Sequence, residues 1–208
     1  MKFISFLSVF IFIFSCSQNK KSIQLENGDL LFLENASGNL SKAIDEVTQT
    51  ENATNYSHIA LVEKSGEEIW VLHAAPEKGS ERISLEDFKK YAENDSSQII
   101  IYRIKKLHQS DFHKAVSQAK AMLGKPYNFT YILSDTAYYC SDFIHNAFLQ
   151  DSVFHMEPMT FKDPETRQFH PTWIEFYQKQ GIEIPEGMPG CNPNGMAASE
   201  KLEKLGRL

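Results

Sequence analysis

Two apolar runs separated by a short polar segment constrain the fold more than any other feature of the sequence. The runs cover residues 57–64 and 68–74, and the turn between them is centred on residues 64–67. This pattern is typical of an antiparallel β-hairpin. A symmetric turn there pairs positions whose numbers sum to 131, which places His58 directly opposite His73 on one face. A loop with one extra residue, or a bulge, would put the two rings on opposite faces.

A third candidate residue, Cys140, begins an amphipathic helix. It shares one helical face with four apolar residues that follow at helical spacing, namely Phe143, Ile144, Ala147 and Phe148. The free N–H groups and the dipole of a helix N-terminus favour the thiolate, and the same N–H groups can bind an oxyanion. A cysteine nucleophile needs a base and a third polar group that orients the base, so Cys140, His58 and His73 together predict hydrolysis or acyl transfer. A buried structural cysteine is the alternative.

The N-terminus has the pattern of an export signal. Lys2 precedes the apolar run 3–14, which is too short to span a membrane. The run ends at Ile13-Phe14-Ser15-Cys16, which resembles the bacterial lipobox, where cleavage leaves a lipid-bearing cysteine at the new N-terminus. We therefore expect residues 1–16 to be a lipoprotein signal peptide ending at the lipidated Cys16, followed by a polar tether, 17–23. A membrane anchor in the bacterial cell envelope, on the periplasmic or outer-surface side, follows; an ordinary secretory signal is the alternative.

Composition narrows the choice of partners. Residues 24–208 have the length of one domain with a hydrophobic core, and removal of the signal changes the formal charge from −6 to −7. No basic stripe is present, so nucleic acid is not an expected partner. After removal of the signal, two cysteines remain, Cys140 and Cys191, in a compartment that is expected to be oxidising. Two cysteines make no disulfide framework, although a single disulfide between them is an alternative. Cys191 has no assigned role. The spacing of histidines and cysteines matches no zinc pattern, and no metal or cofactor is expected.

The remaining pattern predicts an α+β domain in which helices cover an antiparallel sheet. Strands are expected at 28–33 and 98–104 in addition to the hairpin. Helices are expected at 38–48, after the capping-box residue Ser84, after Ser110 as far as Gly124, and after His170-Pro171. The segment 185–194, rich in proline, glycine and asparagine, is expected to be a surface loop, and His145 a surface residue.

The combination resembles the papain-like cysteine hydrolases of the NlpC type, in the circularly permuted branch of YiiX/YebB-like proteins. The segments that carry the resemblance are Gly28-Asp29-Leu30-Leu31-Phe32, Ser57-His58-Ile59-Ala60-Leu61-Val62, Val71-Leu72-His73-Ala74, Gly124-Lys125-Pro126-Tyr127 and Tyr139-Cys140-Ser141-Asp142-Phe143. The histidine precedes the cysteine, which is the order of the permuted branch. Lecithin:retinol acyltransferase and its relatives are more distantly similar.

The resemblance implies a circularly permuted papain-like fold, an antiparallel sheet or half-barrel packed against helices. It makes Cys140 the nucleophile, His58 the general base and His73 the orienting residue. It also implies cleavage of an amide in a peptidoglycan peptide or related small peptide through a thioester. A lipid acyl hydrolase or acyltransferase, or a non-catalytic lipid-anchored binding protein, are the alternatives. The expected substrate contacts come from four residues, Tyr127, Tyr138, Tyr139 and Ser57.

Two positions depart from the pattern of many YiiX-like proteins. Asp142 stands where glutamate is common, and we expect it to keep a negative charge in the first turn of the helix. His73 stands where the third catalytic residue is often glutamate. A neutral histidine orients its neighbour but stabilises an imidazolium less than a carboxylate does. A shifted pH profile is therefore expected.

Overall fold

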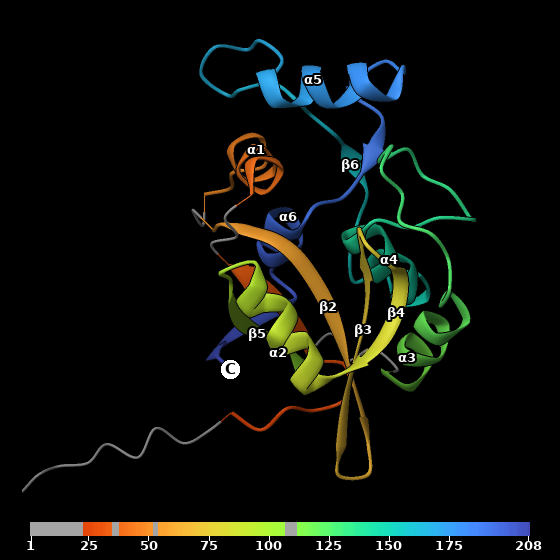
Figure 1. The fold of residues 1–208 in the computed structure, drawn as a ribbon. Helices are drawn as coiled ribbons and strands as arrows, with labels where there is room; N and C mark the ends of the chain where they lie inside the picture. Colours follow the sequence, from red (N-terminus) through yellow and green to blue (C-terminus); the bar gives the residue numbers. More distant parts are fainter. Residues whose placement is uncertain (1–22, 35–37, 52–53, 107–111) are drawn as a thin grey trace, which may run out of the picture.

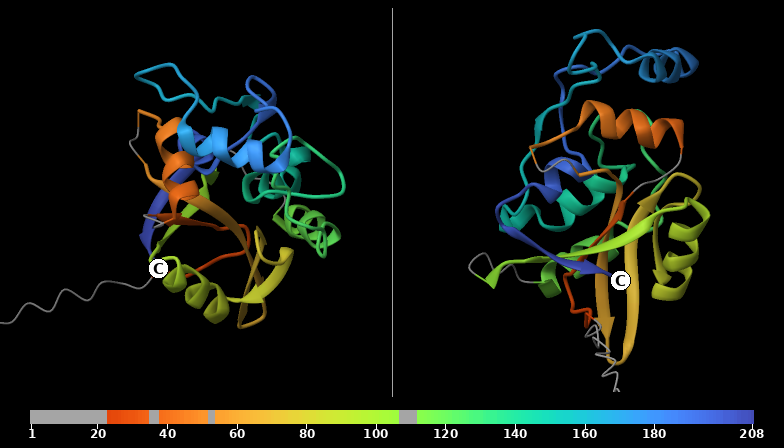
Figure 2. Two further views of the ribbon diagram at one scale, coloured as in Figure 1. Left: turned by 45° about the horizontal axis from the view of Figure 1, so that its top comes forward. Right: turned by 90° about the vertical axis from the view of Figure 1, so that its left-hand side faces the viewer.

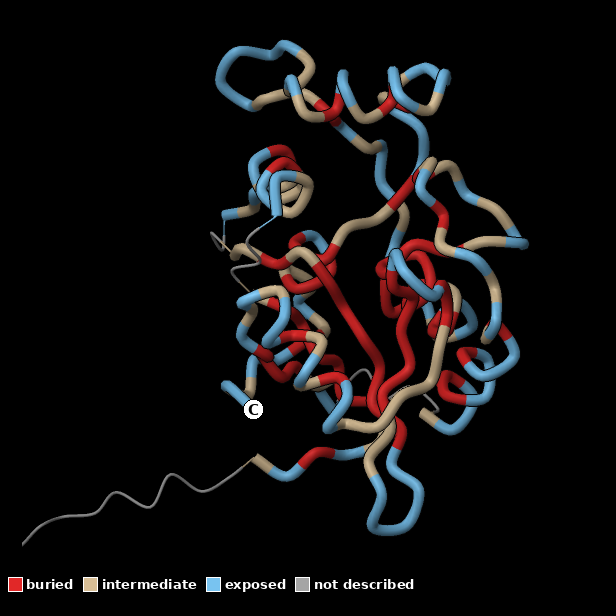
Figure 3. The backbone as a smooth tube through the Cα atoms, in the orientation of Figure 1, coloured by how far each residue is buried: buried red, intermediate tan, exposed pale blue. Residues whose placement is uncertain are grey.

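The central element of the fold is one antiparallel sheet of six strands in the order β4-β3-β2-β1-β5-β8 (Figure 1). The computed structural model describes residues 23–34, 38–51, 54–106 and 112–208. The strands of this sheet are β1 (Leu30–Glu34), β2 (Tyr56–Ser65), β3 (Glu68–Ala75), β4 (Gly79–Ser84), β5 (Gln98–Ile104) and β8 (Leu202–Arg207). Its middle strands are buried on both faces, as the red tube of Figure 3 shows. Because both faces are covered, β1, β2 and β5 have continuous rather than alternating apolar sequences.

Helices cover the two faces of the sheet. Helix α2 (Leu85–Asn94) packs on one face, where Phe88 and Ala92 join a cluster with Leu31 and Val62. Helices α3 (Phe112–Ala121) and α4 (Cys140–Ala147) pack on the other face. The right-hand view of Figure 2 shows α2 and α4 on opposite sides of the strands. Each helix therefore buries one apolar face, which stabilises it far more than its short length does.

A third cluster lies beyond one end of the sheet. It joins α1 (Asn39–Val47) to α5 (Pro171–Gln180) through a set of mostly aromatic side chains that includes Tyr131, Phe161, Trp173 and Tyr177. The remaining short elements are the 3₁₀ helix η2 (Leu149–Asp151), β6 (Glu157–Pro158), β7 (Pro189–Gly190) and α6 (Pro193–Ala197), of which α6 packs in the main core near β2. Figure 1 shows α5 and α1 above the end of β2.

The hairpin register differs from the predicted one. Ser65 pairs with Glu68 and Leu61 with Leu72, so paired positions sum to 133, and the turn consists of Gly66 and Glu67. The prediction that His58 and His73 are directly opposite is therefore wrong. The error is two positions, however, and side chains alternate with a period of two. The two histidines consequently remain on the same face, as diagonal neighbours.

The helices and strands predicted from periodicity are confirmed, including β5 at both of its ends and α2 with Ser84 as its N-cap. The structure adds β4 and β8, which pattern analysis did not predict. The segment 185–194 is not simply a surface loop, since β7 and the start of α6 lie in it. His145 is buried and not a surface residue, because nearly every residue of α4 is buried.

Several predictions concern residues outside the described part of the chain. They include the signal peptide, the lipidation of Cys16 and the cap at Ser110. Within the described residues, no helix combines the length and the apolarity needed to cross a membrane.

Gly79, in the turn between β3 and β4, is predicted to be essential for stability. Its φ of +74° is left-handed, and a Cβ there would lie 2.0 Å from the Lys125 carbonyl oxygen. Gly79→Ala therefore combines backbone strain with a clash, and we expect the free energy of unfolding to fall by about 3 kcal/mol. Gly66→Ala is the matched control: its φ is +64°, but no atom lies within 4 Å of the added Cβ. It should lower the free energy by about 1 kcal/mol. Urea unfolding measures both, and equal losses would contradict the prediction.

Candidate active site

Cys140 lies in the first turn of α4, at the wall of a cavity. Tyr139 is the N-cap residue, with extended backbone angles, and it turns the chain from a loop into the helix. The cavity has a volume of about 500 Å³, which is in the range of small-molecule sites. Cys140 is 5% exposed, so its sulfur is accessible only from this cavity.

Burial determines the protonation state of Cys140. Desolvation raises the pKa of the thiol to about 11, whereas the N–H groups of Ile59, Ser141 and Cys140, together with the Ser141 hydroxyl, lower it by smaller amounts. The helix N-terminus thus acts in the expected direction, but burial outweighs it. At neutral pH Cys140 is therefore a thiol, in agreement with the expectation that the nucleophile needs a base.

His58 and His73 form a buried hydrogen-bonded pair. The His58 Nε2 atom lies 2.9 Å from Nδ1 of His73, and the rings are nearly perpendicular, with an interplanar angle of 88°. His73 is fully buried and His58 is 5% exposed. Burial, and then the neighbouring His73, holds the pKa of His58 well below its usual range. The predicted contact between the two rings is thus present, and His58 is neutral at neutral pH.

Ser57 and Ile59 link the histidine pair to Cys140. Ser57 lines the same cavity as Cys140, and the Ile59 amide faces the Cys140 sulfur. The pairing of β1 with β2 is irregular at this point: Leu33 pairs with His58 but Glu34 pairs with Tyr56, so Ser57 is the extra residue of a bulge. Bulges redirect side chains and are common beside functional sites. His58 itself does not line the cavity.

Helix α2 separates the histidine pair from solvent. The Tyr91 ring centroid lies 5.5 Å from that of His58 and 5.4 Å from that of His73. Phe88 contacts His73 edge to face at 5.4 Å. These aromatic rings exclude water, and a charge that develops on the pair is therefore stabilised only by nearby protein groups.

Glu81 is a site residue that sequence reasoning missed. It lies directly opposite His73 in the pairing of β3 with β4, and its Oε1 atom is 3.4 Å from Nε2 of His73. The contact and the proximity of Lys78 hold the pKa of Glu81 below its usual value. Gly79, between two extended segments, is the sequence signal that indicates this strand pair.

The tyrosines around Cys140 fall into two groups. Tyr127, Tyr131 and Tyr139 line the cavity, as the resemblance implied for Tyr127 and Tyr139. Tyr138 does not line the cavity, because its ring packs against Phe143 in the main core. Burial raises the pKa of Tyr127 and Tyr131, with an added effect of the nearby Cys140, so both hydroxyls stay protonated as donors. Tyr131 also has a left-handed φ of 56°, a strained conformation of the kind that occurs at functional sites.

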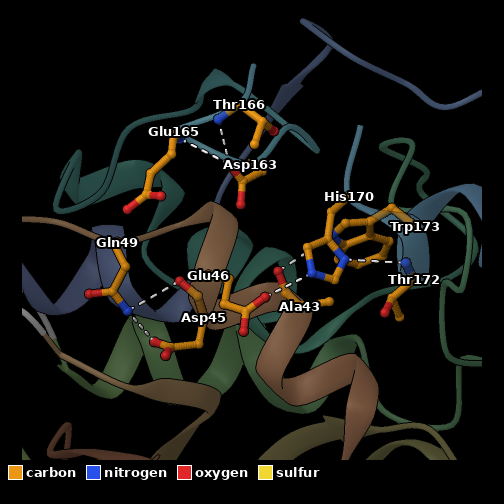
Figure 4. A network of polar contacts seen from close by, with 10 residues as sticks. All are labelled: Ala43, Asp45, Glu46, Gln49, Asp163, Glu165, Thr166, His170, Thr172 and Trp173. Atoms are coloured by element: carbon orange, nitrogen blue, oxygen red, sulfur yellow. Dashed lines mark hydrogen bonds and ion pairs between the residues drawn. The ribbon is translucent and has the colours of Figure 1, made fainter. Parts of the chain in front are cut away.

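Helices α1 and α5 are held together where their side chains cover the cavity. His170 caps α5 by accepting a hydrogen bond from the Thr172 amide at Nδ1, and its Nε2 contacts Glu46 of α1 at 2.7 Å (Figure 4). The Trp173 indole donates to the Ala43 carbonyl at 3.4 Å. Because Trp173 and residues of α1 line the cavity, these contacts fix part of its wall.

Cys191 lies on the same cavity wall as Cys140, and both are free thiols. The disulfide considered from the sequence is therefore absent. The Cys191 backbone is held on both sides: its amide donates to the Tyr139 hydroxyl at 3.2 Å, and its carbonyl accepts from the Ser141 hydroxyl at 3.0 Å. These contacts attach the 189–192 segment to the start of α4.

Asp142 departs from its expected charge. It is 1% exposed, its Oδ1 accepts a hydrogen bond from Asn146, and Oδ2 has no partner within the described residues. Burial raises its pKa to about 7, against the opposing effect of Asn146. The expectation of a full negative charge in the first turn is corrected, since about half of the molecules carry a neutral Asp142 at pH 7.

The comparisons agree with this architecture. The family described as "Permuted papain-like amidase enzyme, YaeF/YiiX, C92 family" matches residues 24–206. This is a class of papain-like cysteine hydrolases with a permuted chain order, and the protein belongs to this amidase family. No curated protein matches the chain.

A solved structure with the same fold is that of yiiX from Escherichia coli O157:H7. The match has a TM-score of 0.72 and 21% sequence identity, and it covers 89% of this chain and 99% of that one. That protein is described as a metalloprotein. In the described part of the present chain, no group of three or more His, Cys, Asp or Glu side chains is arranged to hold a metal ion.

Asp142 is predicted to reduce stability as the pH rises. Its folded-state pKa of about 7 is above the unfolded value, so the folded state binds more protons between pH 4 and 7. Below pH 4 the neutral carboxyl contributes its full stabilisation. This contribution is lost as the pH rises from 4 to 7, and above pH 7 the free energy of unfolding no longer changes because of Asp142. Asp142→Asn should remove this slope, with a difference of roughly 2–4 kcal/mol across the window. Urea unfolding at several pH values measures it; Asp151→Asn, at a half-exposed position, is the control and should retain the slope.

Proposed function

We propose that the protein is a cysteine hydrolase that cleaves an amide bond through Cys140, His58 and His73. Membership of the amidase family supports the reaction. The observation that carries the residue assignment is the buried His58–His73 hydrogen bond, together with the contact of the neighbouring Ile59 amide with the Cys140 sulfur. A buried pair of histidines is a costly arrangement unless it has a role, and orientation of a base is a role that it fits.

The mechanism uses a neutral resting site. His58 takes the thiol proton of Cys140 as the sulfur attacks the carbonyl carbon, and the carbonyl electron pair moves to oxygen. When the tetrahedral intermediate collapses, the C–N bond breaks and His58 gives the proton to the leaving amine. Water, deprotonated by His58, then attacks the thioester and releases the carboxylic acid and the Cys140 thiol. His73 holds His58 in one orientation throughout.

The oxyanion has donors at the start of α4. The amides of Cys140 and Ser141 face the sulfur, and a carbonyl that the sulfur attacks lies within reach of the same groups. Tyr127 and Tyr131 add protonated hydroxyls on the cavity wall. Tyr139 is the poorer candidate because its hydroxyl lies 3.9 Å from the Cys191 sulfur, to which it can donate its proton.

The proposed substrate is an amide of the cell envelope, most simply a peptide of peptidoglycan or a related small peptide. A lipid anchor at Cys16 would place the domain at the envelope, and the family reaction is amide cleavage. The cavity is open to a bound group of peptide size, and Ser57, Tyr127 and Tyr139 offer polar contacts beside Cys140.

A lipid acyl amide or ester is the second candidate, and the wall of the cavity favours it. Apolar side chains from four separate segments line the space, for example Val47, Phe154, Phe161 and Met196. No lysine or arginine is among the described residues of the lining, although wall peptides carry carboxylates. An acyl chain fits the apolar part of such a wall, and Glu157, which is the acidic residue of the described lining, is exposed to solvent.

Replacement of the nucleophile is the first test. Cys140→Ala should abolish turnover, because it removes the nucleophilic sulfur, and it should preserve the fold, because alanine is small and favours the helix in which position 140 lies. Cys191→Ala is the matched control on the same wall and should retain activity. Product formation from defined peptidoglycan peptides and from N-acyl and phospholipid substrates is followed by mass spectrometry, and circular dichroism checks folding. Turnover by the Cys140→Ala protein would refute the assignment.

A further inference from the structure

We propose that Glu81 is a positioning residue that completes a Cys140–His58–His73–Glu81 series, in which its carboxylate fixes the tautomers of both histidines and stabilises the imidazolium formed during attack. The inference rests on the proposed function, because it concerns the same reaction. It supplies the carboxylate whose absence at position 73 set this chain apart from the pattern of many YiiX-like proteins.

The geometry begins at the buried ring of His73. Its Nδ1 faces His58 at 2.9 Å and its Nε2 faces Glu81 Oε1 at 3.4 Å. The second contact is longer than an ideal hydrogen bond but lies within the range of an ion pair. Within the described residues, Nε2 makes no hydrogen bond of good geometry, the atom is shielded from solvent, and the Glu81 contact is the polar contact recorded for it. Glu81 is therefore the group that compensates a buried N–H at this position.

The carboxylate decides which nitrogens carry protons. A carboxylate only accepts, so the proton of neutral His73 resides on Nε2 and its Nδ1 is an acceptor. His58 must then donate from Nε2 to His73, and its lone pair is on Nδ1. The outcome is one defined base nitrogen on His58. With Glu81 absent, the His73 ring has no reason to prefer this tautomer, and a fraction of the molecules would hold His58 with its lone pair directed at His73.

The carboxylate also supplies charge where water is absent. The proton that His58 accepts from Cys140 creates an imidazolium beneath Phe88 and Tyr91, next to a neutral His73. The ionised Glu81 is the nearest anion along the hydrogen-bond series. At reduced dielectric, its attraction for the developing charge is larger than at the surface.

The groups that face this series are few. Lys78, in the β3–β4 turn, contacts the other Glu81 oxygen at 3.8 Å but is 71% exposed. Tyr91 of α2 contacts both histidine rings, and burial raises its pKa, so it stays uncharged. Glu77, Cys140 and Asp95 are further titratable groups that act on Tyr91. The turn also fixes Glu81 in place, since Gly79 leaves no room for a side chain against Lys125.

The test measures alkylation of Cys140 by iodoacetamide from pH 4 to 9 on the full chain, with peptide mass spectrometry to report Cys140 alone. Glu81→Gln keeps the shape and an acceptor oxygen but removes the charge. We expect the neutral-pH rate to fall roughly 10-fold and the acid limb to move about one pH unit lower, because the protonated histidine pair loses its counter-ion. Glu81→Asp should restore part of both effects.

Two charge variants serve as controls. Glu77→Gln removes the same charge from the adjacent turn at an exposed position, and Lys78→Gln removes the other ion partner of Glu81 while keeping its carboxylate. Both should alkylate at the wild-type rate. If His58→Ala lowers the alkylation rate but Glu81→Gln shows the wild-type pH profile, the role of Glu81 is refuted and the proposed function is not. A rate that is unaffected by His58→Ala would instead refute the proposed function.

Imidazole ¹⁵N–¹H spectra test the tautomers directly. Wild type should show both rings protonated at Nε2, Glu81→Gln should preserve this through its amide oxygen, and Glu81→Ala should show mixed tautomers. If Glu81 had only a structural role, the ring signals of Glu81→Gln and Glu81→Ala would not differ in tautomer. Unchanged ring signals in Glu81→Ala would contradict the inference, and circular dichroism identifies a variant that has failed to fold.

Discussion

The hydrogen bond between His58 and His73 is the interaction on which the arrangement of the site depends. It requires β2 and β3 to be neighbours in a fixed register, and it requires α2 to cover that face so that neither ring exchanges its partner for water. The bulge at Ser57 then brings the strand backbone to Cys140. The sheet, α2 and α4 are therefore connected through one pair of side chains.

Burial has opposing consequences in this site. It raises the pKa of Cys140 and lowers that of His58, so the resting pair is neutral and the thiol is not a spontaneous nucleophile. The same dry environment strengthens every interaction with a charge that appears during reaction. It also raises the pKa of Asp142, whose second oxygen has no partner within the described residues. Reactivity must therefore come from positioned groups rather than from a permanently ionised sulfur.

Much of the fold followed from local patterns, because hydrophobic periodicity reports which face of a segment is buried. The helices at α1 and α2, the start of α4, and strand β5 were predictable in this way. The hairpin register was not, since the residues 64–67 are compatible with more than one turn, and the structure uses Gly66 and Glu67. The conclusion that both histidines share a face survived only because the shift was even. Strand β8 has a polar sequence typical of an edge, which carries little periodic signal.

The sequence by itself determined the residue types of the site, the reversed order of histidine and cysteine, and the membership of Cys140 in the first turn of a helix. These are properties of a segment and its neighbours along the chain. Tertiary structure decided that Glu81 lies against His73, that Asp142 is half neutral, that Tyr138 packs away from the cavity and that Cys191 lies beside it. Each of these results depends on burial and on contact between segments distant in sequence, and neither quantity is encoded in local spacing.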